Sequence, residues 1–205
     1  MITIVDYGMG NIGSLENMIS RVGGESCFAS TPEEIQNAEK LLLPGVGSFD
    51  NAVSRLRQSG LWEVIDTKVR VDKVPILCIC LGAQLATESS EEGRLEGFGW
   101  LRAKAKLFSF SDGDRRIPHM GWNDVRLMKD SILTRGLAED PAFYFVHSYF
   151  IEALDPADVV MQTEYGLEFA SGLERDNVFA FQFHPEKSHK YGMTIIRNFS
   201  ELQYA

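Results

Sequence analysis

The sequence predicts an α/β protein in which helices flank a mainly parallel central sheet. Short apolar runs alternate with stretches of helical periodicity through the first 80 residues, and this alternation is typical of parallel sheets. The 205 residues suffice for one domain with a sizeable core, and no internal repeat, low-complexity stretch or long linker divides them. We therefore expect a single domain over residues 1–205.

Short apolar runs predict strands, because buried strands read as brief, nearly continuous hydrophobic segments. These runs lie at residues 2–5, 40–43, 74–79, 100–107, 143–146 and 178–183. Turns separate the later runs, so the second half differs in character from the first.

Helical periodicity and capping signals predict the helices. Apolar residues recur at helical spacing from Leu15 to Val22, ahead of a glycine pair that ends the helix. Thr31 and Glu34 flank a proline and form a capping box, which marks the start of a second helix. We expect helical sequence over about residues 50–70 and a final helix over about residues 188–202.

Composition and charge limit the possible classes of function. Hydrophobic residues make up 44% and charged residues 24% of the chain, as in ordinary globular proteins. The net charge of −9 argues against a nucleic-acid-binding protein. The sequence has neither an apolar run of the roughly 18–20 residues that span a bilayer nor a signal-peptide pattern. We expect a cytoplasmic protein that binds neither nucleic acid nor membrane.

Cys80 is a candidate nucleophile. It follows an apolar run and precedes a helix start, where the helix dipole and free N–H groups favour a thiolate. A nucleophile elbow usually has glycine two residues before and two residues after the nucleophile. Gly82 fits this pattern, whereas Cys78 occupies the earlier position. The alternative is a buried core cysteine, which is the commoner fate of this residue type.

His184-Pro185-Glu186 supplies a candidate base and its orienting carboxylate. The motif follows the last predicted strand, at the strand end where open α/β sheets place their sites. An imidazole can take the thiol proton and return it to a leaving amine, and a carboxylate can fix the imidazole tautomer. A loop histidine beside an unrelated carboxylate is the alternative for the motif alone.

Residues 44–47 read Pro-Gly-Val-Gly and follow another predicted strand. Two glycines allow the backbone to turn its N–H groups toward a developing oxyanion. An ordinary turn is the alternative.

Two further patterns suggest ligands that we do not expect. Residues 8–13 spell G-x-G-x-x-G, but the acidic residue that dinucleotide-binding proteins need after the second strand is replaced by Ala29-Ser30. A possible metal set lacks the spacing of a zinc ribbon or finger. Its members are Cys78, Cys80, His184 and His189. We therefore expect no cofactor and no metal.

Together these motifs resemble those of class I, triad-type glutamine amidotransferases, and above all the glutaminase subunits of imidazole glycerol phosphate synthases. The resemblance covers essentially the whole chain and implies a flavodoxin-like, three-layer fold. The motifs that carry it are DYGMGN (6–11), LPGVGSF (43–49), CLGAQ (80–84), SEEG (90–93), PHMGWN (118–123), YFVHSY (144–149) and FQFHPEKS (181–188).

The resemblance implies a reaction and a set of site residues. Cys80 would attack the side-chain amide of L-glutamine, with His184 as base and acid and Glu186 orienting the imidazole. The implied oxyanion hole consists of Gly45, Val46 and Leu81. The implied substrate-binding residues are Gln84, Glu92, Ser148 and Tyr149.

The resemblance also implies a partner. In the family, a (β/α)8-barrel cyclase receives the ammonia, and the glutaminase is nearly idle until that partner binds its ligand. Trp122, Tyr144 and Lys187 would face this partner in a heterodimer. Two departures from the family pattern are Cys78 in place of the elbow glycine and Ala83 in place of methionine.

Three other functions remain open at this stage. A paralogous subunit could supply ammonia for amidino-sugar formation in surface-polysaccharide synthesis, because the acceptor belongs to the partner. Cys78 alone suggests a non-catalytic partner-binding module, and the complete triad argues against this alternative. A cysteine peptidase on a related scaffold would leave Gln84, Glu92 and the partner-facing motifs without a role.

Overall fold

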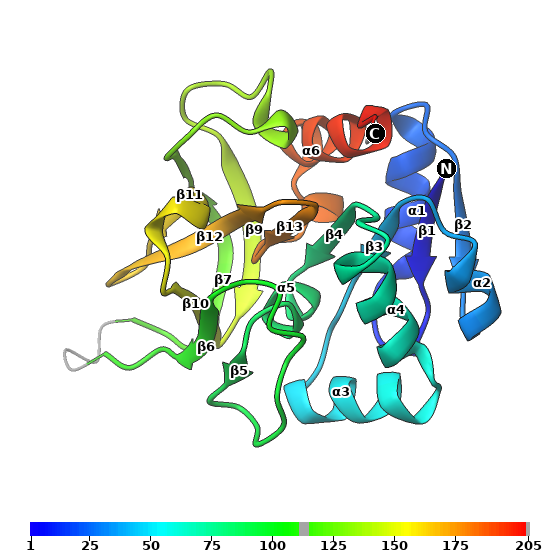
Figure 1. Ribbon diagram of the computed structural model, residues 1–205. Coiled ribbons are helices and arrows are strands. Elements are labelled where there is room, and N and C mark those ends of the chain that lie inside the picture. The colour runs from blue at the N-terminus through cyan, green and yellow to red at the C-terminus, as the bar shows by residue number, and fades with distance from the viewer. Residues whose placement is uncertain (111–114, 204–205) are drawn as a thin grey trace.

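The computed structural model describes residues 1–110 and 115–203. A mixed sheet runs through the molecule, with helices packed on both of its faces (Figure 1). Its strands are β1 (Ile2–Val5), β2 (Ser26–Ala29), β3 (Leu41–Leu43), β4 (Ile76–Ile79), β5 (Ser89–Ser90), β6 (Ala103–Leu107), β8 (Arg126–Leu127), β10 (Tyr149–Ala153), β11 (Val159–Glu164), β12 (Glu168–Arg175) and β13 (Val178–Phe181).

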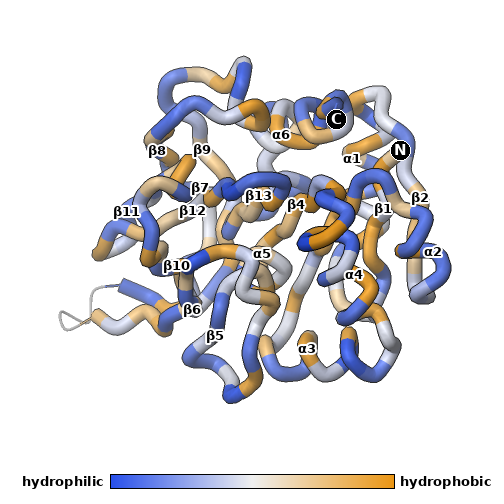
Figure 2. Tube along the Cα trace, viewed as in Figure 1, coloured by the Kyte–Doolittle hydropathy of each residue, from blue (hydrophilic) through white to orange (hydrophobic). Residues whose placement is uncertain are grey.

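Five strands form the parallel half of the sheet, in the order β2-β1-β3-β4-β13. This is the strand order of flavodoxin-like folds, with the sequence order reversing between β1 and β3. β1 and β4 are fully buried and, except for Thr3, apolar, and Figure 2 shows hydrophobic residues along both. The prediction of a mainly parallel sheet flanked by helices is thus confirmed.

The second half of the chain extends the sheet with antiparallel strands. β12 pairs with β13, and β10 and β6 follow outward from it, while β11 and β8 attach beside β12. β7 (His119–Asp124) and β9 (Ala142–His147) form a separate two-stranded sheet.

Two hydrophobic cores hold the three layers together. One core joins the sheet to α2 (Pro32–Gln36), α3 (Phe49–Gln58), α4 (Leu61–Arg70) and α5 (Leu81–Leu85). The other joins the opposite face to α1 (Ile12–Arg21) and α6 (His189–Glu201) and continues into the phenylalanine-rich strands β9 and β13. Three short 3-10 helices complete the described chain: η1 (Ile132–Thr134), η2 (Pro156–Asp158) and η3 (Pro185–Lys187).

Several element boundaries differ from the prediction. Residues 50–70 are helical as predicted, but they form two helices, because Gly60 adopts a left-handed conformation (φ +71°) that ends α3 and starts α4. Residues 100–102 precede β6 rather than forming part of it, and β13 ends at Phe181. The capping box of Thr31 and Glu34 is confirmed at the start of α2. None of the described helices has the length and apolar character of a membrane span.

Candidate active site

A cavity of about 420 Å³ lies where β3, β4 and β13 end. It collects residues from both halves of the chain, as expected for a site at the carboxyl edge of an α/β sheet. Its lining residues are Val46, Gly47, Cys80, Leu81, Gln84, Glu92, Pro118, Val146, His147, Ser148, Tyr149, His184 and Lys187.

Cys80 sits on the sharp turn between β4 and α5. Its φ of +54° is unusual for a residue with a side chain, and its backbone N–H donates to the Phe181 carbonyl at 2.8 Å. The turn requires glycine at position 82, because a Cβ there would lie 2.0 Å from the Leu43 carbonyl oxygen. The strand-to-helix elbow expected around Cys80 is therefore present.

Cys78 does not prevent this elbow. Its side chain is fully buried in β4, where the residue pairs with Leu43 and Ala180 of the two neighbouring strands. Burial raises the pKa of the Cys78 thiol well above its usual range, so this sulfur stays protonated. The two nearby cysteines therefore differ: Cys80 lines the cavity and Cys78 belongs to the core.

His184 and Glu186 form a buried pair beside Cys80. The Nδ1 atom of His184 lies 2.8 Å from Oε1 of Glu186, and their side chains are 4% and 2% exposed. The histidine backbone is held by a hydrogen bond from its N–H to the Tyr144 carbonyl and by one from the Ser188 hydroxyl to its own carbonyl. This arrangement leaves Nε2 as the ring atom available for a proton transfer.

Electrostatics favour a protonated imidazole at this position. Burial lowers the pKa of His184, but interactions with Cys80 and Glu186 outweigh that effect and raise it to about 10. No described group meets full hydrogen-bond geometry with Nε2. Hydrogen bonds of catalytic groups often form only when substrate is present, so Nε2 is free to engage the Cys80 thiol or the substrate.

The segment after β3 faces the same cavity. Val46 and Gly47 line it, and Val46 is 46% exposed. Leu81 lines it as well and is the first residue of α5, where backbone N–H groups lack partners inside the helix. Gly45 is not among the lining residues but packs behind them, because a Cβ there would lie 2.8 Å from that of Leu81.

The four residues expected to bind substrate all line the cavity. Gln84 is buried, and its Nε2 donates to the Tyr149 carbonyl at 3.1 Å. Glu92 accepts a hydrogen bond from the Phe49 N–H at 2.8 Å, so one of its oxygens caps the start of α3. Ser148 lies between β9 and β10 and Tyr149 begins β10, and both are half-buried.

The three residues expected to face a partner form one surface cluster. Trp122 and Tyr144 pair across β7 and β9, and their ring centroids lie 6.3 Å apart. The Lys187 Nζ lies 5.6 Å from the Tyr144 ring centroid, and Trp122 also stacks on His189 at 5.4 Å. Of these residues, only Lys187 lines the cavity.

No role was predicted for His147, Val146 or Pro118, which line the cavity, or for Gln182, which lies behind it. All four stand within the motifs that carry the resemblance, so the signal was present but had no chemistry attached. Gln182 is also the one amide in the predicted strand over residues 178–183.

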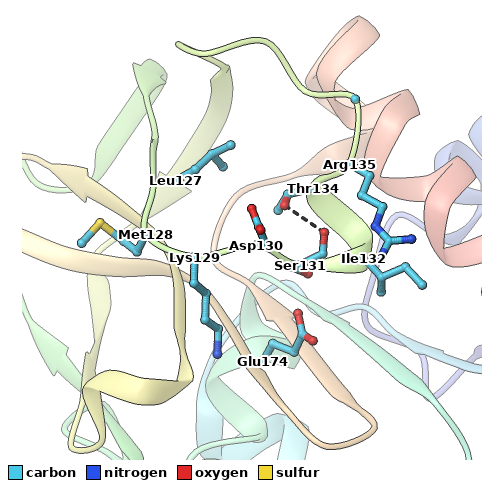
Figure 3. A pocket seen from close by; sticks show the side chains of 10 residues that line it. Leu127, Met128, Lys129, Asp130, Ser131, Ile132, Thr134, Arg135 and Glu174 are labelled. Atoms are coloured by element: carbon cyan, nitrogen blue, oxygen red, sulfur yellow. Dashed lines mark hydrogen bonds between the residues drawn. The ribbon is translucent and has the colours of Figure 1, made fainter.

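A larger cavity of about 710 Å³ lies elsewhere, between the segment after β8 and Glu174 of β12 (Figure 3). It shares no lining residue with the first cavity and carries charges of both signs, including Lys129, Asp130 and Arg135. It contains no cysteine or histidine, so we place the chemistry at Cys80. Within residues 1–110 and 115–203, no group of three or more potential ligands could hold a metal ion.

The fold and a cysteine, histidine and glutamate at this sheet edge are features of the triad amidotransferases, and residues 3–202 match the family Glutamine amidotransferase class-I, to which the chain belongs. Within this family, it is 49% identical to imidazole glycerol phosphate synthase subunit HisH 2 of Methanococcus maripaludis, over 97% of this chain and 98% of that protein. It is 46% identical to the protein of the same name from Pseudomonas aeruginosa, over 98% and 100%. PurLQS from Thermotoga maritima shares the fold at 17% identity, with a TM-score of 0.72 over 97% of this chain and 96% of that one.

Proposed function

We propose that this chain is the glutaminase subunit of an imidazole glycerol phosphate synthase, which hydrolyses L-glutamine and passes the ammonia to a second subunit in histidine biosynthesis. The observation that carries the proposal is the buried pair of His184 and Glu186, 2.8 Å apart, beside a cysteine on a strained elbow. The full-length likeness to subunits of that synthase supports the pathway.

The proposed reaction begins with Cys80 as an anion and His184 as an imidazolium. The sulfur attacks the side-chain carbonyl carbon of glutamine, and His184 gives its proton to the departing ammonia. A γ-glutamyl thioester remains on Cys80. His184 then takes a proton from water, which attacks the thioester and releases glutamate. Glu186 stabilises the imidazolium through Nδ1 throughout these steps.

We propose that the backbone N–H groups of Val46 and Leu81 stabilise the oxyanion of each tetrahedral intermediate. Both residues line the cavity next to Cys80, whereas the role of Gly45 is to let this turn lie against α5. Loss of one such donor costs roughly 3–4 kcal/mol of transition-state stabilisation. A turn with glycine on both sides of Val46 can rotate its peptide between two orientations, and this allows a partner to control the rate.

The amino-acid end of glutamine is proposed to lie between Gln84, Glu92, Ser148 and Tyr149. Both hydrogens of the Gln84 amide are directed to protein groups, at Tyr149 and Gln182. Its Oε1 can therefore accept a hydrogen bond from the substrate ammonium, whose charge Glu92 would balance. A peptide substrate would not present these two charged ends, which argues against a cysteine peptidase.

The proposed partner is a (β/α)8-barrel cyclase that docks on the cluster of Trp122, Tyr144 and Lys187. Trp122 is 48% exposed, and exposed aromatic side chains beside a charge are typical anchors of protein interfaces. Lys187 belongs both to this cluster and to the lining of the cavity that contains Cys80, so the cluster lies beside that cavity. Ammonia could thus leave toward the partner.

The test is glutamate release by the lone subunit, by its complex with the barrel protein of the same organism, and by that complex with the cyclase ligand. We expect very slow turnover alone and an increase of about 100- to 1,000-fold with liganded partner, the range that one oxyanion donor supplies. Full activity of the lone subunit would contradict the gating. Stimulation only by a sugar-pathway synthase would instead assign the chain to amidino-sugar formation.

Charge reversal separates docking from chemistry. Lys187→Glu should weaken partner stimulation more than it changes basal hydrolysis. Lys190→Glu is the matched control, because Lys190 also lies over a tyrosine ring, at 4.8 Å from the Tyr191 centroid, but does not line the cavity. Equal loss of stimulation in both variants would contradict the proposed docking site.

A further inference from the structure

Gln182 is a buried polar residue that contacts the nucleophile and has no part in the steps above. It follows β13 and is fully buried, and its Nε2 lies 3.9 Å from the Cys80 sulfur. We propose that Gln182 is a positioning residue that holds a hydrogen-bond donor against the Cys80 sulfur, in an orientation fixed by a network of buried side chains. This inference rests on the proposed role of Cys80 as the nucleophile.

The orientation of the Gln182 amide follows from its neighbours. The two ends of a carboxamide have nearly the same shape, so hydrogen-bond partners decide which end points where. A backbone carbonyl can only accept, so Gln84 must present its Nε2 to the Tyr149 carbonyl at 3.1 Å. The same Nε2 lies 3.3 Å from Oε1 of Gln182 and donates its second hydrogen there. Gln182 is thereby left with Nε2 toward the sulfur.

The Tyr149 carbonyl is itself fixed from the other side. His147 Nδ1 lies 2.8 Å from it and must donate, so His147 Nε2 accepts from His119 Nδ1 at 3.0 Å. The remaining ring nitrogen of His119 then accepts from the Asn123 amide at 3.2 Å, which also donates to the Glu164 carbonyl at 2.9 Å. A carbonyl oxygen, which can only accept, lies at each end of this chain of hydrogen bonds. Each of the two histidine rings therefore has a single possible neutral tautomer.

Both rings are suited to remain neutral in this network. Burial lowers the pKa of His119 to about 4 and that of His147 to about 3. Neither ring therefore takes up a proton near neutral pH, and the direction of every hydrogen bond is preserved. The network runs from β7, beside Trp122, to the sulfur of Cys80.

The chemical value of this orientation lies in the charge of the sulfur. With its proton on His184, the sulfur is an anion, and the Val146 carbonyl oxygen 4.0 Å away then repels it. Apart from the His184 imidazolium that has taken the proton, the Gln182 amide is the side chain among the described residues that offers the sulfur a hydrogen-bond donor. Reversal of this amide would place a second oxygen beside the anion. The fixed amide thus favours the reactive form of Cys80.

The test measures the reactivity of Cys80 directly, without glutamine or a partner. Wild-type protein, Gln182→Met and Gln182→Glu are alkylated with iodoacetamide at pH 7, and the labelled Cys80 peptide is quantified by mass spectrometry over time. Gln182→Met keeps the length of the side chain but removes the donor. We therefore expect alkylation to slow about tenfold, which corresponds to the loss of a hydrogen bond to a charged group at the weak end of the usual range. Gln182→Glu keeps an acceptor for Gln84 but turns an oxygen toward the sulfur, so we expect a larger loss.

Asn177→Asp provides the matched control. Asn177 lies at the other end of β13, is also buried, and donates to the Val69 and Val74 carbonyls. Its loss should lower the thermal unfolding temperature without slowing Cys80 alkylation. Gln182→Met should also lower kcat for glutamine in the complex more than it changes KM, because Gln182 does not line the cavity and Gln84 keeps its hydrogen bond to the Tyr149 carbonyl.

Alkylation of folded Gln182→Met within twofold of wild type would overturn the proposal, as would equal slowing in Asn177→Asp. If Gln182→Glu does not fold, the methionine variant alone decides. Reactive Cys80 in a complex that hydrolyses no glutamine would refute the proposed function and leave the positioning role of Gln182 intact.

Discussion

Replacing Gly82 with alanine should break the elbow that presents Cys80. The added Cβ would lie 2.0 Å from the Leu43 carbonyl oxygen and 3.0 Å from its carbon, whereas real Cβ contacts essentially never fall below 3.0 Å. β3 and α5 must therefore separate by at least about 1 Å at a point where both are buried. We expect Gly82→Ala to lower the free energy of unfolding by about 2–3 kcal/mol. Glutamine hydrolysis should fall further still, because the oxyanion turn begins one residue after Leu43.

Gly13→Ala is the control for this substitution. Gly13 is also the second residue of its helix, but a Cβ there meets nothing within 4 Å. Alanine should raise stability at this position by about 0.4–1 kcal/mol. Thermal unfolding should thus separate the variants in sign, with a decrease of about 4–12 °C for Gly82→Ala and an increase of about 1–4 °C for Gly13→Ala. Similar unfolding temperatures for the two variants would refute the argument that this close approach requires glycine.

Three further predictions concern the triad, pH and a helix start. His184→Asn should abolish nearly all glutamine hydrolysis. Glu186→Gln should retain more activity, because the base remains and only its orientation weakens. Equal activities of the two variants would contradict the assignment of His184 as the base and Glu186 as the group that orients it. Burial lowers the pKa of His119 to about 4 and that of His147 to about 3, whereas both rings titrate near pH of about 6.5 in the unfolded chain. Below that pH the unfolded chain therefore binds up to two more protons than the folded protein. The free energy of unfolding should decrease as the pH falls, by at most about 2.7 kcal/mol per pH unit. Urea midpoints at pH 7, 6 and 5 measure this, and His147→Gln should reduce the slope. Thr31→Ala should cost about 1 kcal/mol by removing the capping box of α2, with full glutamine hydrolysis retained in the complex.

The sequence predicted the parallel half of the fold well because its signals are local. Four of its five strands, β1, β3, β4 and β13, coincide with predicted apolar runs, and the start of α2 carries its own capping box. Gly60 shows where local evidence fell short: helical spacing continues on both sides of it, and only its left-handed backbone reveals two helices. β12 was missed because its glycine and charged ends hide an antiparallel strand.

The candidate site divides in the same way. Cys80 and His184 were recognisable because each follows a strand directly, and parallel strands bring their carboxyl ends together. Gln182 was not, since its significance depends on an amide orientation set by Gln84 and Tyr149, which are distant in sequence. Relations of this kind require three-dimensional contacts, and no periodicity within the chain encodes them.

The central place of β13 has a consequence for how the protein is made. β13 follows every other described strand in sequence, yet it pairs with β4 on one side and β12 on the other, joining the two halves of the sheet. On the ribosome, both halves must wait with exposed strand edges until residue 181 has emerged, and exposed edges invite aggregation. The same delay means that Cys80 meets His184 only after residue 184 has been made. A nascent chain that stalls earlier therefore carries an unactivated thiol and cannot consume glutamine.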